Sequence, residues 1–171
     1  ADLSRHLGPT AILATNTSSL SIDDIGQLAS RRERVVGMHF FNPVEKMPLV
    51  EVIAGSLTAE SAVRTATAFA RRLGKTPVVV RDGPGFLVNR LLAFYSAEAM
   101  WLLDEGHRVE AIDRALVDWG IPMGPLRLAD EVGLDVSAKV GRILHGAFPD
   151  RLLFPAWIER VAGDATRLGA K

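Results

Sequence analysis

The sequence predicts an α/β part, residues 1–81, followed by an all-helical part, residues 82–171. Up to residue 81, short apolar runs alternate with segments of helical periodicity, which is typical of a sheet covered on both faces. The segment DGPG at 82–85 then interrupts the pattern. Beyond it, every apolar pattern has a helical period. At 171 residues, the chain is long enough for one domain or two small ones.

Four strands and two helices are expected in the first part. The strands are short apolar runs at 10–15, 34–40, 49–53 and 76–81. Ser21 opens the first helix, since acidic residues follow it in the first turn. The second helix lies between Thr58, which can cap its start, and Gly74, which ends it.

The second part contains five helical segments. The first has one wide apolar stripe that ends at Gly106, and Gly120 and Pro122 stop the second. The segments lie at 86–105, 109–119, 124–132, 134–146 and 155–162.

Composition excludes several classes of protein. Lys plus Arg equals Asp plus Glu at 20 each, which argues against nucleic-acid binding by phosphate neutralisation. The chain has no Cys, so it has no disulfide and no thiolate metal site, and we expect no metal. The longest uncharged stretch, 6–22, is too polar to span a membrane, and the N-terminus lacks a signal-peptide pattern. We therefore expect no membrane insertion and a cytoplasmic location.

One carboxylate lies inside a strand that reads as buried. Glu51 is flanked by apolar residues in LVEVI, and a buried carboxylate is costly unless it is paired. A turn centred near Glu45 sets this strand antiparallel to the preceding one and places His39 opposite Glu51. A histidine oriented by a buried carboxylate can act as a general base. The alternative is a buried ion pair without a catalytic role.

Other polar residues lie near the ends of the predicted elements. Asn16 and Ser18 directly follow the first strand, at the sheet edge where ligands bind, although they also suit a turn. Asn42 precedes a proline just after the His39 strand, and Asn89 lies one turn into the long helix. No carboxylate is placed to orient the histidines at 6, 107 and 145, so we expect no functional role for them. The GPGFLV segment lacks the third glycine of a dinucleotide-binding turn and is interpreted as a plain strand-to-helix turn.

Four co-linear motifs resemble the NAD-dependent 3-hydroxyacyl-CoA dehydrogenases of fatty-acid β-oxidation. They are NTSSLSI (16–22), VVGMHFFNPVEKMPLVEVI (35–53), LGKTPVVVRDGPGFLVNRLL (73–92) and WGIPMGPLRLADEVGLDV (119–136). The MPLVE and HGAFPDRL segments are more similar to the dehydrogenase region of the large multifunctional β-oxidation subunit. The resemblance implies the C-terminal part of a Rossmann-like sheet domain followed by a helical domain like that of 6-phosphogluconate dehydrogenase.

The resemblance also implies a reaction and its residues. NAD takes a hydride from C3 of a 3-hydroxyacyl-CoA, while His39, paired with Glu51, removes the hydroxyl proton. Ser18 and Asn89 correspond to residues that hold the substrate, and Ser18 also lies near the nicotinamide, as do Asn16 and Asn42. The implied partners are the acyl-CoA substrate, a second copy in a homodimer and, in a multifunctional enzyme, a thiolase subunit.

The family's nucleotide-binding half, with its glycine fingerprint, has no counterpart in this sequence. We therefore expect a piece of a longer enzyme that is inactive by itself. Two alternatives stay open: a non-catalytic helical association module and a related dehydrogenase of small hydroxy acids. The first draws on the apolar helix residues Leu91, Phe94, Met100, Trp101 and Leu103.

Overall fold

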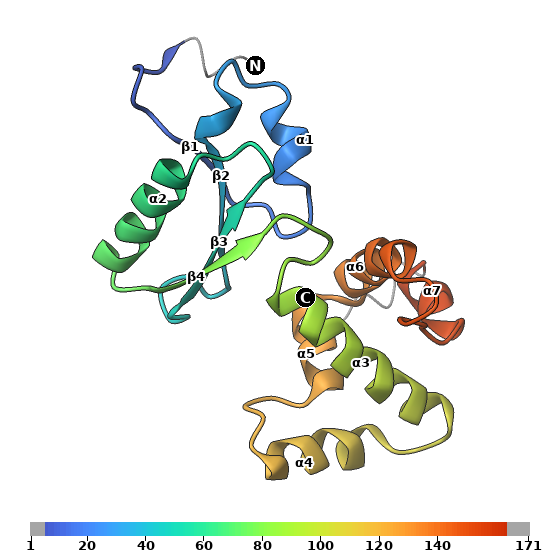
Figure 1. Ribbon diagram of the computed structural model, residues 1–171. Helices are drawn as coiled ribbons and strands as arrows, with labels where there is room; N and C mark the ends of the chain where they lie inside the picture. Colours follow the sequence, from blue (N-terminus) through green and yellow to red (C-terminus); the bar gives the residue numbers. More distant parts are fainter. Residues whose placement is uncertain (1–5, 164–171) are drawn as a thin grey trace. The chain divides into compact units, whose positions relative to one another are not determined.

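The computed structural model describes residues 6–163, which form two compact units that meet in sequence at Leu87 and Val88 (Figure 1). Each unit is described by itself. The loop after residue 81 belongs to the first unit, because the Asp82 N–H donates to the Ala54 carbonyl and Phe86 joins a buried cluster on the sheet.

The first unit is a mixed four-stranded sheet with helices on its two faces (Figure 1). Its elements are β1 (Leu13–Thr15), α1 (Ile22–Gly26), the 3-10 helix η2 (Arg32–Arg34), β2 (Val35–Phe40), β3 (Leu49–Ala54), α2 (Glu60–Arg72) and β4 (Thr76–Arg81). The strand order is β1-β2-β3-β4; β2 and β3 are antiparallel, and the two outer pairs are parallel. All four predicted strands are present, but β1 is shorter than expected because its partner strand begins only at Val35.

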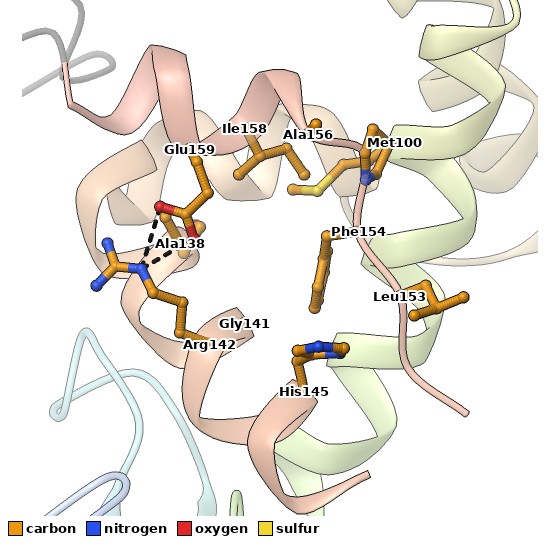
Figure 2. Close-up of a pocket in the computed structure, with 12 residues that line it drawn as sticks. Met100, Ala138, Gly141, Arg142, His145, Leu153, Phe154, Ala156, Ile158 and Glu159 are labelled. Atoms are coloured by element: carbon orange, nitrogen blue, oxygen red, sulfur yellow. Dashed lines mark hydrogen bonds and ion pairs between the residues drawn. The ribbon is translucent and has the colours of Figure 1, made fainter. Parts of the chain in front are cut away.

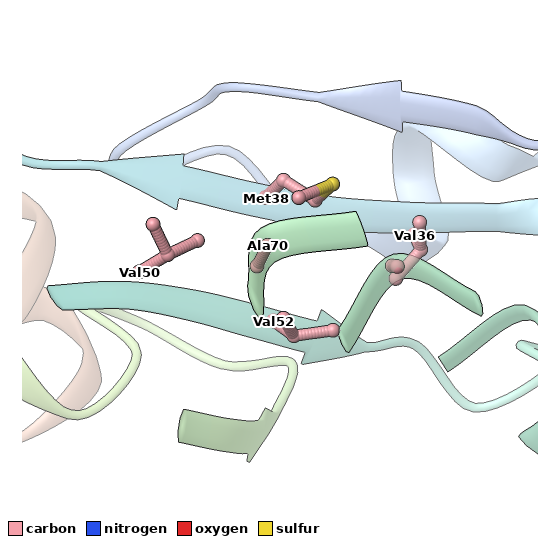
Figure 3. Packing of buried hydrophobic residues seen from close by; sticks show 6 residues of the cluster. Val36, Met38, Val50, Val52 and Ala70 are labelled. Atoms are coloured by element: carbon pink, nitrogen blue, oxygen red, sulfur yellow. The ribbon is translucent and has the colours of Figure 1, made fainter. Parts of the chain in front are cut away.

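Along β2 and β3, successive side chains point to opposite faces of the sheet, and each face has its own buried core. On the α2 side, Val36, Met38, Val50 and Val52 pack against Ala66 and Ala70 (Figure 3). On the other side, Val35 and Ile53 pack against Ile22 of α1 and Phe86. Because side chains two residues apart share a face, His39 and Glu51 belong to this second side.

Gly37 lies on the same side of β2, where the packing leaves no room for a side chain. A Cβ there would come within 2.8 Å of Ile53 and 2.9 Å of Ile22. We expect Gly37→Ala to lower the free energy of unfolding by about 1–3 kcal/mol, as overpacked cores do. Urea unfolding of the chain measures this. Gly8→Ala is the control, since nothing lies within 4 Å of that position; equal stability of the two variants would contradict the prediction.

The two predicted caps of the first unit had different outcomes. Ser21 is the N-cap of α1, and its Oγ accepts the Asp24 N–H at 3.2 Å, as predicted. The predicted cap by Thr58 is wrong, because α2 begins after Ala59 without a side-chain cap. The Thr58 hydroxyl instead donates to the Val35 carbonyl at 2.7 Å and accepts the Gly55 N–H at 2.9 Å. A tertiary contact has taken the side chain that could have capped the helix.

The second unit contains the five predicted helices. They are α3 (Val88–Asp104), α4 (Val109–Trp119), α5 (Pro125–Val132), α6 (Leu134–Ala147) and α7 (Trp157–Ala162). Helix α3 starts later than predicted, since Gly85 and Phe86 have φ of +69° and +46°, which a right-handed helix cannot include. Two buried apolar clusters hold the helices together, one that includes Leu144 and one that includes Met100. No helix within residues 6–163 is long and apolar enough to cross a membrane.

The carboxylate of Asp113, a residue of α4, is bonded to the start of α5. It accepts the N–H groups of Leu126 and Arg127, at 2.9 and 3.0 Å, and so caps α5. Burial raises the pKa of the Tyr95 phenol, and the Asp113 charge raises it further. Tyr95 therefore stays protonated and donates to the Met123 carbonyl.

Candidate active site

His39 and Glu51 form the cross-strand pair that the sequence predicts. The two residues are register partners in the antiparallel β2–β3 ladder. The His39 Nδ1 lies 2.8 Å from the Glu51 Oε2. His39 is 6% exposed and Glu51 is fully buried at 0%, so the pair is almost completely removed from water. A carboxylate in such a place is tolerated only with partners, which explains why it faces the imidazole.

The pair fixes the chemical state of the imidazole. A carboxylate accepts hydrogen bonds, so the neutral ring carries its proton on Nδ1 and leaves a lone pair on Nε2. Nε2 can then accept a proton, and the carboxylate beside Nδ1 stabilises the imidazolium that results. This arrangement is that of a general base with an orienting carboxylate.

The Glu51 carboxylate has a second partner that the sequence did not indicate. Its Oε1 accepts the backbone N–H of Leu87 at 2.9 Å. Two aromatic rings also lie beside the imidazole, Phe41 at 4.5 Å and Phe86 at 5.9 Å between ring centroids. The loop after β4 therefore contributes a backbone donor and an aromatic ring to the site.

The polar residues after β1 lie next to the end of β2. The Asn16 Oδ1 accepts the N–H of Phe40, the residue after His39, at 2.9 Å. The Thr17 hydroxyl accepts the N–H groups of Ser19 and Leu20 and shapes the turn in which Ser18 is exposed. Asn42 is exposed beyond the end of β2, before a cis proline bond. Asn16 is thus a structural bridge between β1 and β2 at the sheet edge that carries His39.

Asn89 belongs to the other unit. It is the second residue of α3 and is half-buried there. The first unit by itself brings together His39 and Glu51, with Asn16 bonded to the residue beside His39.

The helical unit contains a separate pocket of about 330 Å³, shown in Figure 2. Apolar side chains such as Met100, Phe154 and Ile158 line it. Three of its polar side chains have partners: the His145 Nδ1 donates to the Leu152 carbonyl at 2.8 Å, and Arg142 pairs with Glu159 at 2.9 Å. The sequence predicts no functional role for His145 and does not predict this pocket, because nothing in the local pattern shows that α6 and α7 leave a space.

Within residues 6–163, no group of three or more His, Asp or Glu side chains is placed to hold a metal ion. The His39–Glu51 pair supports proton transfer, and polar groups after β1 lie close to the same sheet edge.

Comparison with known proteins identifies the family. A family model described as "3-hydroxyacyl-CoA dehydrogenase, NAD binding domain" matches residues 1–83. A second, described as "3-hydroxyacyl-CoA dehydrogenase, C-terminal domain", matches residues 85–171. The two matches meet in the loop between β4 and α3.

Curated relatives include the fatty acid oxidation complex subunit alpha of Shewanella frigidimarina, which is 53% identical over 163 residues. That match covers 95% of this chain but only 23% of the relative, so the chain spans about a quarter of its length. The sequence resemblance to a multifunctional subunit agrees with this relative.

Solved structures give the same family. The (S)-3-hydroxybutyryl-CoA dehydrogenase PaaH1 of Ralstonia eutropha is 39% identical with a TM-score of 0.89, over 95% of this chain and 58% of that one. The 3-hydroxybutyryl-CoA dehydrogenase of Escherichia coli is 40% identical with a TM-score of 0.91, over 98% of this chain and 36% of that one. With both family models matched in order along the sequence, the chain belongs to the 3-hydroxyacyl-CoA dehydrogenase family.

Proposed function

We propose that this chain carries the proton-transfer machinery of an NAD-dependent 3-hydroxyacyl-CoA dehydrogenase of fatty-acid β-oxidation. The enzyme converts (S)-3-hydroxyacyl-CoA to 3-ketoacyl-CoA. The observation that supports this most is the buried His39–Glu51 pair, whose contact of 2.8 Å leaves Nε2 as the basic atom. Membership in the family supports the choice of a 3-hydroxyacyl thioester as the alcohol.

In the proposed reaction, the His39 Nε2 takes the proton of the substrate's 3-hydroxyl as the C3 hydride leaves. Glu51 stabilises the imidazolium that forms and keeps the proton of Nδ1 in place. Ser18 hydrogen-bonds the substrate oxygen, and Asn89 helps to hold the substrate. Asn16 and Asn42 lie with Ser18 on the nicotinamide side. When bound, NAD supplies the hydride acceptor. In the reverse direction, the imidazolium of His39 is the acid.

The described residues suit only the nicotinamide end of NAD. Polar side chains follow β1 at the sheet edge that carries His39, where ligands of open α/β sheets bind. The GPGF turn before α3 does not suit the pyrophosphate, because the Gly83 carbonyl accepts the Phe86 N–H and the Leu87 N–H binds Glu51. No glycine-rich phosphate turn is present within residues 6–163.

An absorbance assay for NADH tests the proposed function. The complete natural polypeptide that contains residues 1–171 is assayed with a 3-ketoacyl-CoA and, separately, with free 2- and 3-keto acids. We expect turnover with the thioester. Turnover with the free acids alone would favour a dehydrogenase of small hydroxy acids, and turnover with neither would contradict the proposed function.

The two oxygens of Glu51 lead to a prediction for Glu51→Gln. Both oxygens accept hydrogen bonds, one from His39 and one from the Leu87 amide. A glutamine side chain has one acceptor and one donor, and only the imidazole can change its tautomer to suit. The amide NH₂ therefore faces Nδ1, the ring proton moves to Nε2, and the base is lost. We expect kcat to fall about 10²-fold, the lower range for loss of a general base, with little change in KM.

Steady-state kinetics of the complete polypeptide and ¹⁵N NMR of the His39 ring measure this effect. Glu60→Gln is the matched control, because Glu60 is an exposed helix residue paired with Arg64. A Glu51→Gln variant that loses stability but keeps normal kcat in its folded fraction would make Glu51 a structural residue only.

The partners belong to the same proposal. Within the helical unit, Leu91 is 64% exposed and Trp119 is 78% exposed, which favours association with a second copy of the chain in a homodimer. Not all the apolar helix residues expected to be exposed are exposed: Met100 is buried, and Phe94 and Leu103 are half-buried. We also propose a thiolase subunit as a further partner, which agrees with a relative named as a subunit of a complex, and the cytoplasm as the location.

The second candidate function is a non-catalytic association module, which would use the same exposed apolar side chains. Sedimentation of the complete polypeptide with Trp119→Ala tests the homodimer. NAD titration separates the two functions, since an association module has no reason to bind the cofactor.

A further inference from the structure

The loop from Asp82 to Leu87 is anchored to the sheet unit at both ends. At its start, the Asp82 Oδ2 accepts the Ser21 hydroxyl at 2.7 Å and the Asp23 N–H at 3.0 Å, so it is bonded to the first turn of α1. At its end, the Leu87 N–H donates to Glu51. Both anchors are hydrogen bonds to a carboxylate, which are among the stronger ones in proteins.

Between the anchors, the backbone makes two changes of direction. The Phe86 N–H donates to the Gly83 carbonyl at 3.0 Å, with a proline second and a glycine of φ +69° third in the turn. This is the pattern of a type II turn. Phe86 then has φ +46°, a left-handed conformation that is uncommon for a large residue and costs about 1–2 kcal/mol.

The surroundings of Phe86 account for this unfavourable conformation. Its side chain is 3% exposed and packs with Ile22, Val35 and Ile53. The same ring lies 5.9 Å from the imidazole of His39, whose other neighbour is Phe41 at 4.5 Å. The buried ring holds the residue in the left-handed region, and that conformation turns the next amide toward the Glu51 oxygen.

We propose that Phe86 is a positioning residue for the His39–Glu51 pair. Its left-handed backbone directs the Leu87 amide to Glu51, and its ring limits the rotation of the imidazole. One residue thereby holds both members of the pair, the carboxylate through a backbone donor and the histidine through contact. The inference rests on the proposed function and adds to it a residue that does not touch the reacting atoms.

Two variants separate the contributions of ring and backbone. Phe86→Leu keeps a buried apolar side chain and removes the aromatic face, whereas Phe86→Gly also frees the backbone. We expect kcat of the complete polypeptide to fall about 10-fold in the first and about 10²-fold in the second, because small misplacements of catalytic groups cost this much. The KM values should change less than about threefold, because the Phe86 side chain is only 3% exposed and so is not available to the substrates. Phe94→Leu, a half-buried phenylalanine of the helical unit, is the control.

The second measurement is ¹⁵N NMR of His39 in the chain of residues 1–171, which needs no turnover. We expect a single Nδ1–H tautomer in the wild type and a mixture of tautomers in both variants. Unchanged tautomer signals overturn the proposal, whatever happens to kcat, and so do kcat values within about twofold of wild type. If Phe86→Gly does not fold, Phe86→Leu decides alone, because it nearly conserves volume. If the complete wild-type polypeptide lacks dehydrogenase activity, the proposed function fails, and the tautomer measurement still decides whether Phe86 positions the pair.

Discussion

His39→Gln is expected to lower kcat of the complete polypeptide at least ~10²-fold, with NAD affinity nearly unchanged. A glutamine side chain can hydrogen-bond but cannot take a proton near neutral pH, and removing a general base costs about 10²–10⁴ in rate. The loss acts on the reaction and not on cofactor binding, because the imidazole is committed to Glu51 at 2.8 Å. Steady-state kinetics in both directions and an NAD titration measure the two quantities.

The control for His39→Gln is His145→Gln. The His145 imidazole also makes a hydrogen bond through Nδ1, but its acceptor is the Leu152 carbonyl and not a carboxylate. We expect its kcat to stay within about twofold of wild type. Similar kinetics for the two variants would show that His39 is not the base, and the pair would then be a buried ion pair with a structural role.

The second large effect is expected when residues 1–171 are assayed without the rest of the polypeptide. This chain should not turn over substrate. Hydride transfer requires the nicotinamide close to C3 of the substrate, in an orientation that allows attack. In α/β dehydrogenases, that placement depends on a glycine-rich turn and a helix N-terminus that hold the pyrophosphate. The sequence has no G-x-G-x-x-G, and the GPGF turn binds its own Gly83 carbonyl and Glu51.

The measurement is NADH oxidation with a 3-ketoacyl-CoA, on the purified chain beside the complete natural polypeptide. We expect the rate of the chain to be at the background of the assay, and calorimetric titration of the chain with NAD to show no binding in the micromolar range that is usual for enzyme ligands. Turnover comparable to that of the complete polypeptide would contradict the prediction and show that these residues suffice to place the cofactor.

Much of the site could be predicted from two local properties of the sequence. An acidic residue in an otherwise apolar strand must have a partner, and antiparallel pairing relates residues by a constant sum of their numbers. These two rules led from Glu51 to His39, and the register of β2 and β3 confirms the pairing. The strands and helices were predictable for a similar reason, because their apolar periods reflect one buried face or two.

The errors occurred where a side chain or the backbone serves a distant part of the chain. Threonine is a residue type that often caps helices, but the Thr58 hydroxyl donates to the carbonyl of Val35 on strand β2. Phe86 continues an apolar helical stripe in sequence, yet its φ of +46° places it before the helix. Local patterns could not show either, because the energy that decides both comes from contacts between distant residues.

The sequence by itself therefore determined which strands are buried, which strand contains the carboxylate and which histidine faces it, since alternation along a strand is a property of neighbours in the chain. Only the tertiary structure decided how Glu51 is held. Its second partner is a backbone N–H, which every residue except proline has, so the residue type at position 87 does not predict this hydrogen bond. The direction of that N–H depends on the left-handed conformation of Phe86, and the buried cluster of Ile22, Val35 and Ile53 makes that conformation favourable.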